Sequence, residues 1–164
     1  DCVRLAAKEA DETPRGVIVQ DTAWDGYEEI PAWIMQGYST MAMEAGEQLK
    51  AQGCERPTHI FVQAGVGSLA GAVVGYFSNL YADNLPTFVV VEAEAAACLY
   101  KGAAAGESGA APFGALAAMM TMDEYKDLRN DIGLDENSKV LLFSTEGDTD
   151  PDRYKNIVWK GLDK

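Results

Sequence analysis

The stretch QAGVGSLAG, residues 63–71, holds the residue types most suited to binding an anion. Bare amides around its first two glycines would point toward a phosphate, and the helix expected to open at Ser68 would add its positive dipole end. The Ser68 hydroxyl could cap that helix or bond a phosphate oxygen directly. Alternatively, Gly71 and Gly75 only let the helix pack closely on the sheet. From the spacing alone, phosphate binding and close packing stay equally open.

The order of these glycines differs from two common nucleotide-binding patterns. It is Gly-x-Gly-x-x-x-Gly, where dinucleotide-binding folds have Gly-x-Gly-x-x-Gly, and it lacks the Lys-Ser/Thr ending of a P-loop. Glu92 ends the next apolar run and has the place of a ribose-binding acid, but a solvated surface carboxylate is the simpler interpretation. If the turn binds phosphate, its pattern therefore does not select a nucleotide.

Asp21 is a second candidate, because it directly follows the apolar run GVIVQ at residues 16–20. A partly desolvated carboxyl at that point could act as a general acid or base. The alternative is an Asx turn, and from the residues alone that is the better interpretation. The lone histidine, His59, has no partner pattern, and Tyr38 has the place of a core or lid residue, so we interpret both as structural.

The loop TEGDTD, residues 145–150, follows another apolar run and is a third candidate. Thr145, Asp148 and Thr149 could hydrogen-bond a ligand there. Alternatively, the aspartates of the loop only cap a final helix that begins at Pro151. The residues themselves leave both interpretations open.

Positioning these side chains requires a sheet, and the apolar patterns predict one. We expect strands at residues 16–20, 58–63, 87–92 and 139–144, and helices at residues 2–10, 31–52, 68–81, 93–101 and 151–159, with a further helical region that runs toward residue 129. Strands that are apolar throughout and alternate with helices indicate a parallel sheet in an α/β fold. Ligands bind at the carboxyl ends of such strands, which is where the three candidate loops begin.

Composition and charge bound the class of protein. With 164 residues and 48% apolar content, the chain fits one soluble domain with a single core. Its net charge of −13 argues against nucleic acid or an anionic membrane as a partner, because both select clustered Lys and Arg. No apolar run approaches the ~20 residues that span a bilayer. The widely spaced Cys2, Cys54 and Cys98 form no metal-binding or redox pattern and are typical of reduced thiols, so we expect a cytoplasmic protein without a metal site.

Several long segments, taken in order, resemble one family. They are VIVQDTAWDGYEEIPAWIMQGYSTMA, PTHIFVQAGVGSLAGAVVGYF, VEAEAAACLY, GESGA and LLFSTEGDTDPDRY. They are similar to the diaminopropionate ammonia-lyases, pyridoxal-phosphate enzymes of the tryptophan-synthase-β-like fold (fold type II). The resemblance implies β-elimination of ammonia from 2,3-diaminopropionate, which gives pyruvate and a second ammonia, and it implies a homodimer.

The resemblance also assigns roles to individual residues. The glycine turn would cradle the cofactor phosphate with Gly65, Val66, Gly67, Ser68 and Leu69. Asp21 matches an aspartate that serves acid–base chemistry on the substrate amino groups. The STEGDTD loop resembles the segment that places a hydroxyl against the pyridine nitrogen, and Thr145 is the first choice for that hydroxyl and Ser144 the second. A hydroxyl partner would leave the ring nitrogen unprotonated, which suits elimination.

The chain departs from the family pattern in two ways. None of its eight lysines stands in the phenylalanine–lysine motif of the Schiff-base lysine, which in the family lies upstream of every segment quoted above. In addition, the family has several dozen residues between CLYK and GESGA, where this chain has only GAAA. The chain also begins with DCVRLAAKEA, without a methionine and already within a helical pattern. We therefore expect an incomplete lyase, either a fragment or a chain with a segment missing near residues 102–106.

The resemblance further implies two domain parts and leaves two rival functions. Residues 1–30 would belong to the smaller domain and its return to the larger one, and residues 31–164 to the large cofactor-binding domain. One rival is another β-eliminating enzyme of the fold type, such as a serine or threonine dehydratase, although those enzymes carry shorter glycine–asparagine loops where this chain has DTAWDGY and TEGDTDP. The other is a non-catalytic phosphate- or nucleotide-binding module on the same parallel sheet.

Overall fold

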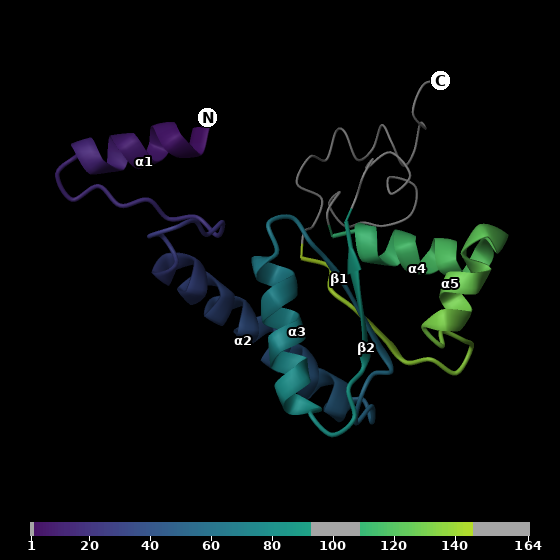
Figure 1. Cartoon of the computed structure of the whole chain (residues 1–164). Coiled ribbons are helices and arrows are strands. Elements are labelled where there is room, and N and C mark those ends of the chain that lie inside the picture. Colours follow the sequence, from purple (N-terminus) through teal and green to yellow (C-terminus); the bar gives the residue numbers. More distant parts are fainter. Residues whose placement is uncertain (1, 93–108, 146–164) are drawn as a thin grey trace, which may run out of the picture.

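A parallel sheet forms the centre of the protein (Figure 1). The computed structural model describes residues 2–92 and 109–145. Within them the sheet has three strands, β1 (His59–Gln63), β2 (Thr87–Val91) and β3 (Val140–Leu142), in the order β2-β1-β3. Both β2 and β3 pair in parallel with β1. The predicted α/β fold with a parallel sheet is therefore confirmed.

The central strand β1 is the most buried of the three described strands. All five residues of β1 are buried, whereas the residues of β2 and β3 are mostly half-buried. This difference follows from the strand order, because β1 has a neighbour on each side and the other two are edge strands of the described sheet. The carboxyl end of β1 leads directly into the glycine turn.

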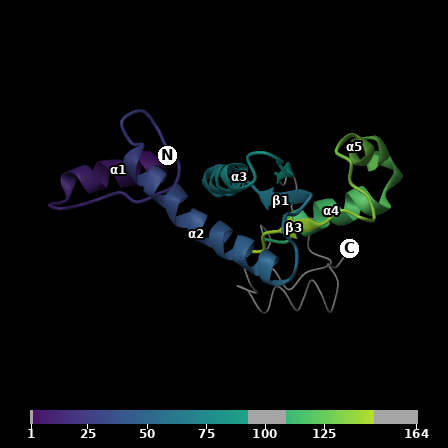
Figure 2. The same ribbon diagram turned by 90° about the horizontal axis from the view of Figure 1, so that it is seen from below.

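Helices lie on both sides of the sheet. They are α1 (Cys2–Glu12), α2 (Glu29–Ala51), α3 (Ser68–Leu80), α4 (Ala111–Thr121), α5 (Lys126–Asp131) and a short 3₁₀ helix, η2 (Asp123–Tyr125). α3 packs against α2 and β1, and α4 packs against β1 and β2. Figures 1 and 2 show α3 and α4 on opposite sides of the sheet, with α1 apart from it. None of these described helices is long and apolar enough to cross a membrane.

Sequence signals explain the bounds of the long helix α2. It begins two residues before Pro31, so the proline falls in the first turn, where its missing N–H is not needed. It ends at Ala51, two residues before Gly53, which adopts φ 77°, a conformation that favours glycine. The predicted helices at residues 93–101 and 151–159 lie outside the described residues.

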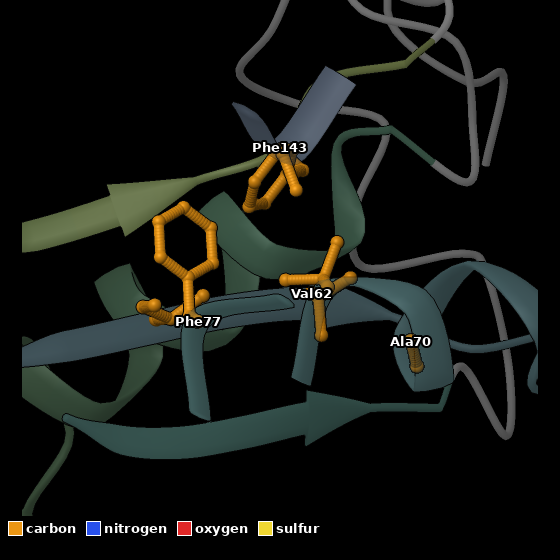
Figure 3. Packing of buried hydrophobic residues seen from close by; sticks show 7 residues of the cluster. Val62, Ala70, Phe77 and Phe143 are labelled. Carbon is orange, nitrogen blue, oxygen red and sulfur yellow. The ribbon is translucent and has the colours of Figure 1, made fainter. Parts of the chain in front are cut away.

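The apolar core lies between the sheet and the pair α2 and α3. Figure 3 shows Val62 of β1, Phe77 of α3 and Phe143 close together, with Ala70 of α3 at the edge of the same cluster. The ring centroids of Phe77 and Phe143 are 6.4 Å apart. Because α3 begins at the glycine turn, this core also holds the site described below in place.

Trimming the core by one methylene group should destabilise the fold measurably. Ile60 of β1 is 0% exposed, so Ile60→Val should lower the free energy of unfolding by about 0.5–1.5 kcal/mol. Ile18 is only half-buried and lies in a loop, so Ile18→Val should cost less than about 0.5 kcal/mol. Urea denaturation of both variants checks the difference, and equal losses would contradict this assignment of the core.

The strand predicted at residues 16–20 is wrong. This run forms no strand, and Val17 and Val19 are each 69% exposed. Its β-branched residues favour an extended conformation, but among the described residues no strand lies alongside to form a ladder. The Tyr27 hydroxyl instead bonds this backbone: it accepts from Gln20 N at 3.0 Å and donates to Ile18 O at 2.9 Å.

Candidate functional site

A pocket of about 370 Å³ gathers most of the predicted site residues. It is lined by Asp21, Tyr38, Gln63, Gly65, Val66, Gly67, Ser68, Leu69 and Thr145. These residues come from the loop before α2, from α2 itself, from β1 and the turn that follows it, from the start of α3, and from the segment after β3. Segments far apart in the sequence therefore meet at the carboxyl ends of β1 and β3, where ligands bind in parallel sheets.

The glycine turn has the backbone shape expected of an anion cradle. Gly67 has φ 97° and is the N-cap residue of α3. A Cβ atom added at Gly65 or Gly67 would meet no atom within 4 Å, so no neighbouring atom excludes a side chain at either position. The amides of the first turn of α3, which have no partner within the helix, lie here together with the positive end of the helix dipole.

Close packing explains one of the other glycines. A Cβ atom at Gly71 would lie 2.9 Å from Met35 Cε of α2, whereas one at Gly75 would meet nothing within 4 Å. The sequence predicted close packing of Gly71 and Gly75 against the sheet, whereas the contact at Gly71 is with α2 and Gly75 has no neighbour within 4 Å. Gly65 and Gly67 border the pocket.

Asp21 lies against the start of α3. Its Oδ2 accepts a hydrogen bond of 2.9 Å from the Ser68 hydroxyl, and Ser68 is 6% exposed. A carboxylate is stabilised at a helix N-terminus by the same amides and dipole that would bind a phosphate. Although the predicted strand before Asp21 is absent, the tertiary structure still brings its carboxylate to the pocket.

Thr145 and Ser144 differ in their relation to the pocket. Thr145 lines it, and its Oγ1 accepts a hydrogen bond of 2.8 Å from Gln63 Nε2. Ser144 is not among the lining residues. Asp148 and Thr149 lie outside the described residues. Of the two predicted hydroxyls, Thr145 is therefore the one that borders the pocket.

Sequence reasoning missed two residues of the pocket. The sequence places Gln63 at the end of an apolar strand and the start of the glycine stretch without assigning it a role, and it indicates a core or lid residue at Tyr38. One signal could have identified Gln63: it is a polar residue at the carboxyl end of a strand that is otherwise apolar, directly before the glycine turn. Tyr38 gave no such signal, because its place on one face of α2 depends on how that helix packs.

His59 lies at the opposite end of β1 and is structural. It is 3% exposed, its Nδ1 lies 2.8 Å from Thr58 Oγ1, and its Nε2 lies 2.8 Å from the carbonyl oxygen of Ile132. Both ring nitrogens therefore have partners, and none of them faces the pocket. Across residues 2–92 and 109–145, no group of three or more His, Cys, Asp or Glu side chains is arranged to hold a metal ion.

Comparison with known proteins gives a consistent assignment. Residues 1–141 match the family described as "Pyridoxal-phosphate dependent enzyme". The chain is 38% identical to the diaminopropionate ammonia-lyase of Salmonella typhimurium and 32% identical to that of Escherichia coli strain K12. Each alignment covers 98% of this chain and 56% of the relative, so the chain spans about half the length of these relatives.

Solved structures show the same relationship. The apo form of Escherichia coli diaminopropionate ammonia-lyase is 37% identical with a TM-score of 0.82, and the match covers 97% of this chain and 52% of that one. The complex of that enzyme with an aminoacrylate–PLP azomethine reaction intermediate is 33% identical, also with a TM-score of 0.82, over 97% of this chain and 56% of that one. The resemblance inferred from the sequence is confirmed, and the chain belongs to the family of pyridoxal-phosphate dependent enzymes.

Proposed function

We propose that this chain supplies the cofactor-holding part of a diaminopropionate ammonia-lyase. The reaction would convert 2,3-diaminopropionate and water into pyruvate and two molecules of ammonia. The observation that carries the proposal is the meeting of the Asp21 carboxylate, the glycine turn and the Thr145 hydroxyl in one pocket. The named relatives support this reaction over the two rivals, a dehydratase and a non-catalytic binding module.

The residues of the pocket fit pyridoxal phosphate. The amides from Gly65 to Leu69 and the Ser68 hydroxyl would hold the phosphate, because the turn is open to a ligand and sits at a helix N-terminus. The Thr145 hydroxyl would face the pyridine nitrogen. The bound cofactor supplies an electron sink for the negative charge that develops at the α-carbon of the substrate.

Asp21 is the residue of this chain proposed to move a proton. A carboxylate beside the turn could take the proton from the α-carbon of one substrate enantiomer, or give a proton to the departing β-amino group. Its hydrogen bond to Ser68 keeps the carboxylate at the edge of the phosphate cradle. A phosphate that enters the cradle would compete for the same hydroxyl, which would direct Asp21 toward the substrate.

A missing internal segment is part of this proposal. The alignment with the Salmonella typhimurium relative spans 228 residues, whereas this chain has 164. More than sixty positions of that alignment therefore have no residue of this chain opposite them. We propose that most of them belong near residues 102–106, which lie outside the described residues, and that the Schiff-base lysine lies outside this chain.

Further proposals concern the domain division, the cellular location and the oligomeric state of the protein. The domain parts at residues 1–30 and 31–164 stay as proposed from the sequence. The described cysteines, Cys2 and Cys54, are free thiols, which supports a cytoplasmic location. A homodimer is proposed from the resemblance, and light scattering of the intact protein would measure it.

An activity assay on the intact protein tests the proposed function. We expect pyruvate to form from 2,3-diaminopropionate, measured with a coupled lactate dehydrogenase assay, at a much higher rate than from serine or threonine. The intact mass should exceed 17.6 kDa by the missing segments. The 164-residue chain by itself should bind the cofactor phosphate but develop no visible Schiff-base absorbance. Faster turnover of serine would favour the dehydratase, and phosphate binding without turnover by an intact protein of full length would favour the binding module.

A further inference from the structure

We propose that Gln63 is a positioning residue that fixes the direction in which the Thr145 hydroxyl donates its hydrogen bond. The inference rests on the proposed function, because the acceptor of that hydrogen bond would be the unprotonated pyridine nitrogen of the cofactor. Gln63 ends β1, is 6% exposed and lines the pocket beside the glycine turn. Its Nε2 donates a hydrogen bond of 2.8 Å to Thr145 Oγ1.

The Thr145 hydroxyl has only one proton with which to donate a hydrogen bond. A threonine hydroxyl has one proton to donate and two lone pairs that accept. Because Thr145 Oγ1 accepts from Gln63 Nε2, its own proton is not used in that contact and stays available to an acceptor in the pocket. A pyridine nitrogen without a proton is such an acceptor.

A protonated ring nitrogen fits this arrangement poorly. It would place a second N–H donor and a positive charge against the same hydroxyl, next to the partly positive Gln63 amide. The hydroxyl proton would then need a different acceptor. Gln63 therefore favours the neutral form of the ring nitrogen, and it does so without touching the ring.

The two ends of the Gln63 amide differ in their partners. Its Oε1 is buried and has no hydrogen-bond partner in the described part of the chain. A glutamine that served only to hold the sheet together would be expected to pair both ends of its amide. Here the paired end is the one that reaches Thr145, across 82 residues of sequence.

The test uses 4′-deoxypyridoxine 5′-phosphate on protein freed of its cofactor. This probe keeps the phosphate and the ring nitrogen but has no aldehyde, so its binding needs no lysine. The measured quantity is the pH at which the ultraviolet spectrum of the bound probe changes as its ring nitrogen is protonated. Gln63→Met removes the amide donor at similar volume. The Thr145 hydroxyl can then accept a hydrogen bond from the protonated ring nitrogen. We expect the midpoint to rise by roughly 0.5–1 pH unit.

Three further comparisons sharpen the result: a Gln63→Glu variant, a Thr145→Val background and a control variant on α2. Gln63→Glu keeps the shape but adds an anion that would draw the Thr145 proton, so the midpoint should rise by ~1–3 units. In a Thr145→Val background, Gln63→Met should cause no further change, because the residue through which Gln63 acts is gone. Gln48→Met, on the exposed side of α2, is the matched control and should leave the midpoint unchanged.

The possible outcomes separate this inference from the proposed function. Probe binding with an unchanged midpoint in both Gln63 variants would overturn the role of Gln63 and leave the cofactor site in place. An equal Gln63→Met shift with and without Thr145 would overturn the positioning route. Absence of probe binding to the unmodified protein would overturn the proposed function and this inference together.

Discussion

Replacing Asp21 by asparagine in the intact protein is expected to lower turnover of 2,3-diaminopropionate by ~10²–10⁴-fold, the usual contribution of a general acid or base. Asparagine keeps the shape of the side chain and can still accept the hydrogen bond that Ser68 donates. It cannot take up or release a proton. Cofactor binding should therefore be retained, because the glycine turn and Thr145 are unchanged.

Asp25 provides the matched control for this experiment. It lies in the same loop, is exposed and does not line the pocket. Asp25→Asn should keep turnover close to that of the unmodified protein. The rates of pyruvate formation from both substrate enantiomers should be measured for each variant. Near-normal turnover of both enantiomers by Asp21→Asn would contradict the acid–base role and would indicate that Asp21 is a simple turn residue.

Replacing Gly67 by valine should weaken cofactor binding by ~10²–10⁴-fold. A valine side chain would stand where the turn is open, and it would hold the phosphate away from the amides. Hydrogen bonds to a charged group contribute about 1.5–3 kcal/mol each, so the loss of two of them gives that range. Equilibrium titration with pyridoxal phosphate, and with inorganic phosphate as a simpler anion, measures the change.

Backbone strain has to be separated from this effect. Gly67 has φ 97°, so valine is strained there whether or not a ligand binds. Gly53 has φ 77°, also has open space around its Cβ position, and does not line the pocket. Both Gly67→Val and Gly53→Val should lower the free energy of unfolding by roughly 1–3 kcal/mol, but only Gly67→Val should lose phosphate affinity. Equal phosphate affinity in the two variants would contradict the assignment of the glycine turn as the phosphate site.

Some of the sequence predictions failed for a reason that a local pattern cannot reveal. The run GVIVQ has the composition of a buried strand, yet Val17 and Val19 are exposed. A strand needs a neighbour to complete its ladder, and the sequence of a run does not state whether a neighbour is present. For the same reason the sequence did not predict that Tyr38 lines the pocket, because its position depends on how α2 packs against α3.

The sequence by itself determined most of the described elements and the local chemistry. Apolar runs specified β1, β2 and β3, and the glycine turn specified the open start of α3, because strand and helix propensities and the need for φ above zero act within a few residues. Only the tertiary structure decided which polar groups meet. Asp21 joins Ser68 across 47 residues and Gln63 joins Thr145 across 82. Parallel pairing brings the carboxyl ends of β1 and β3 side by side, and no local signal encodes contacts at such separations.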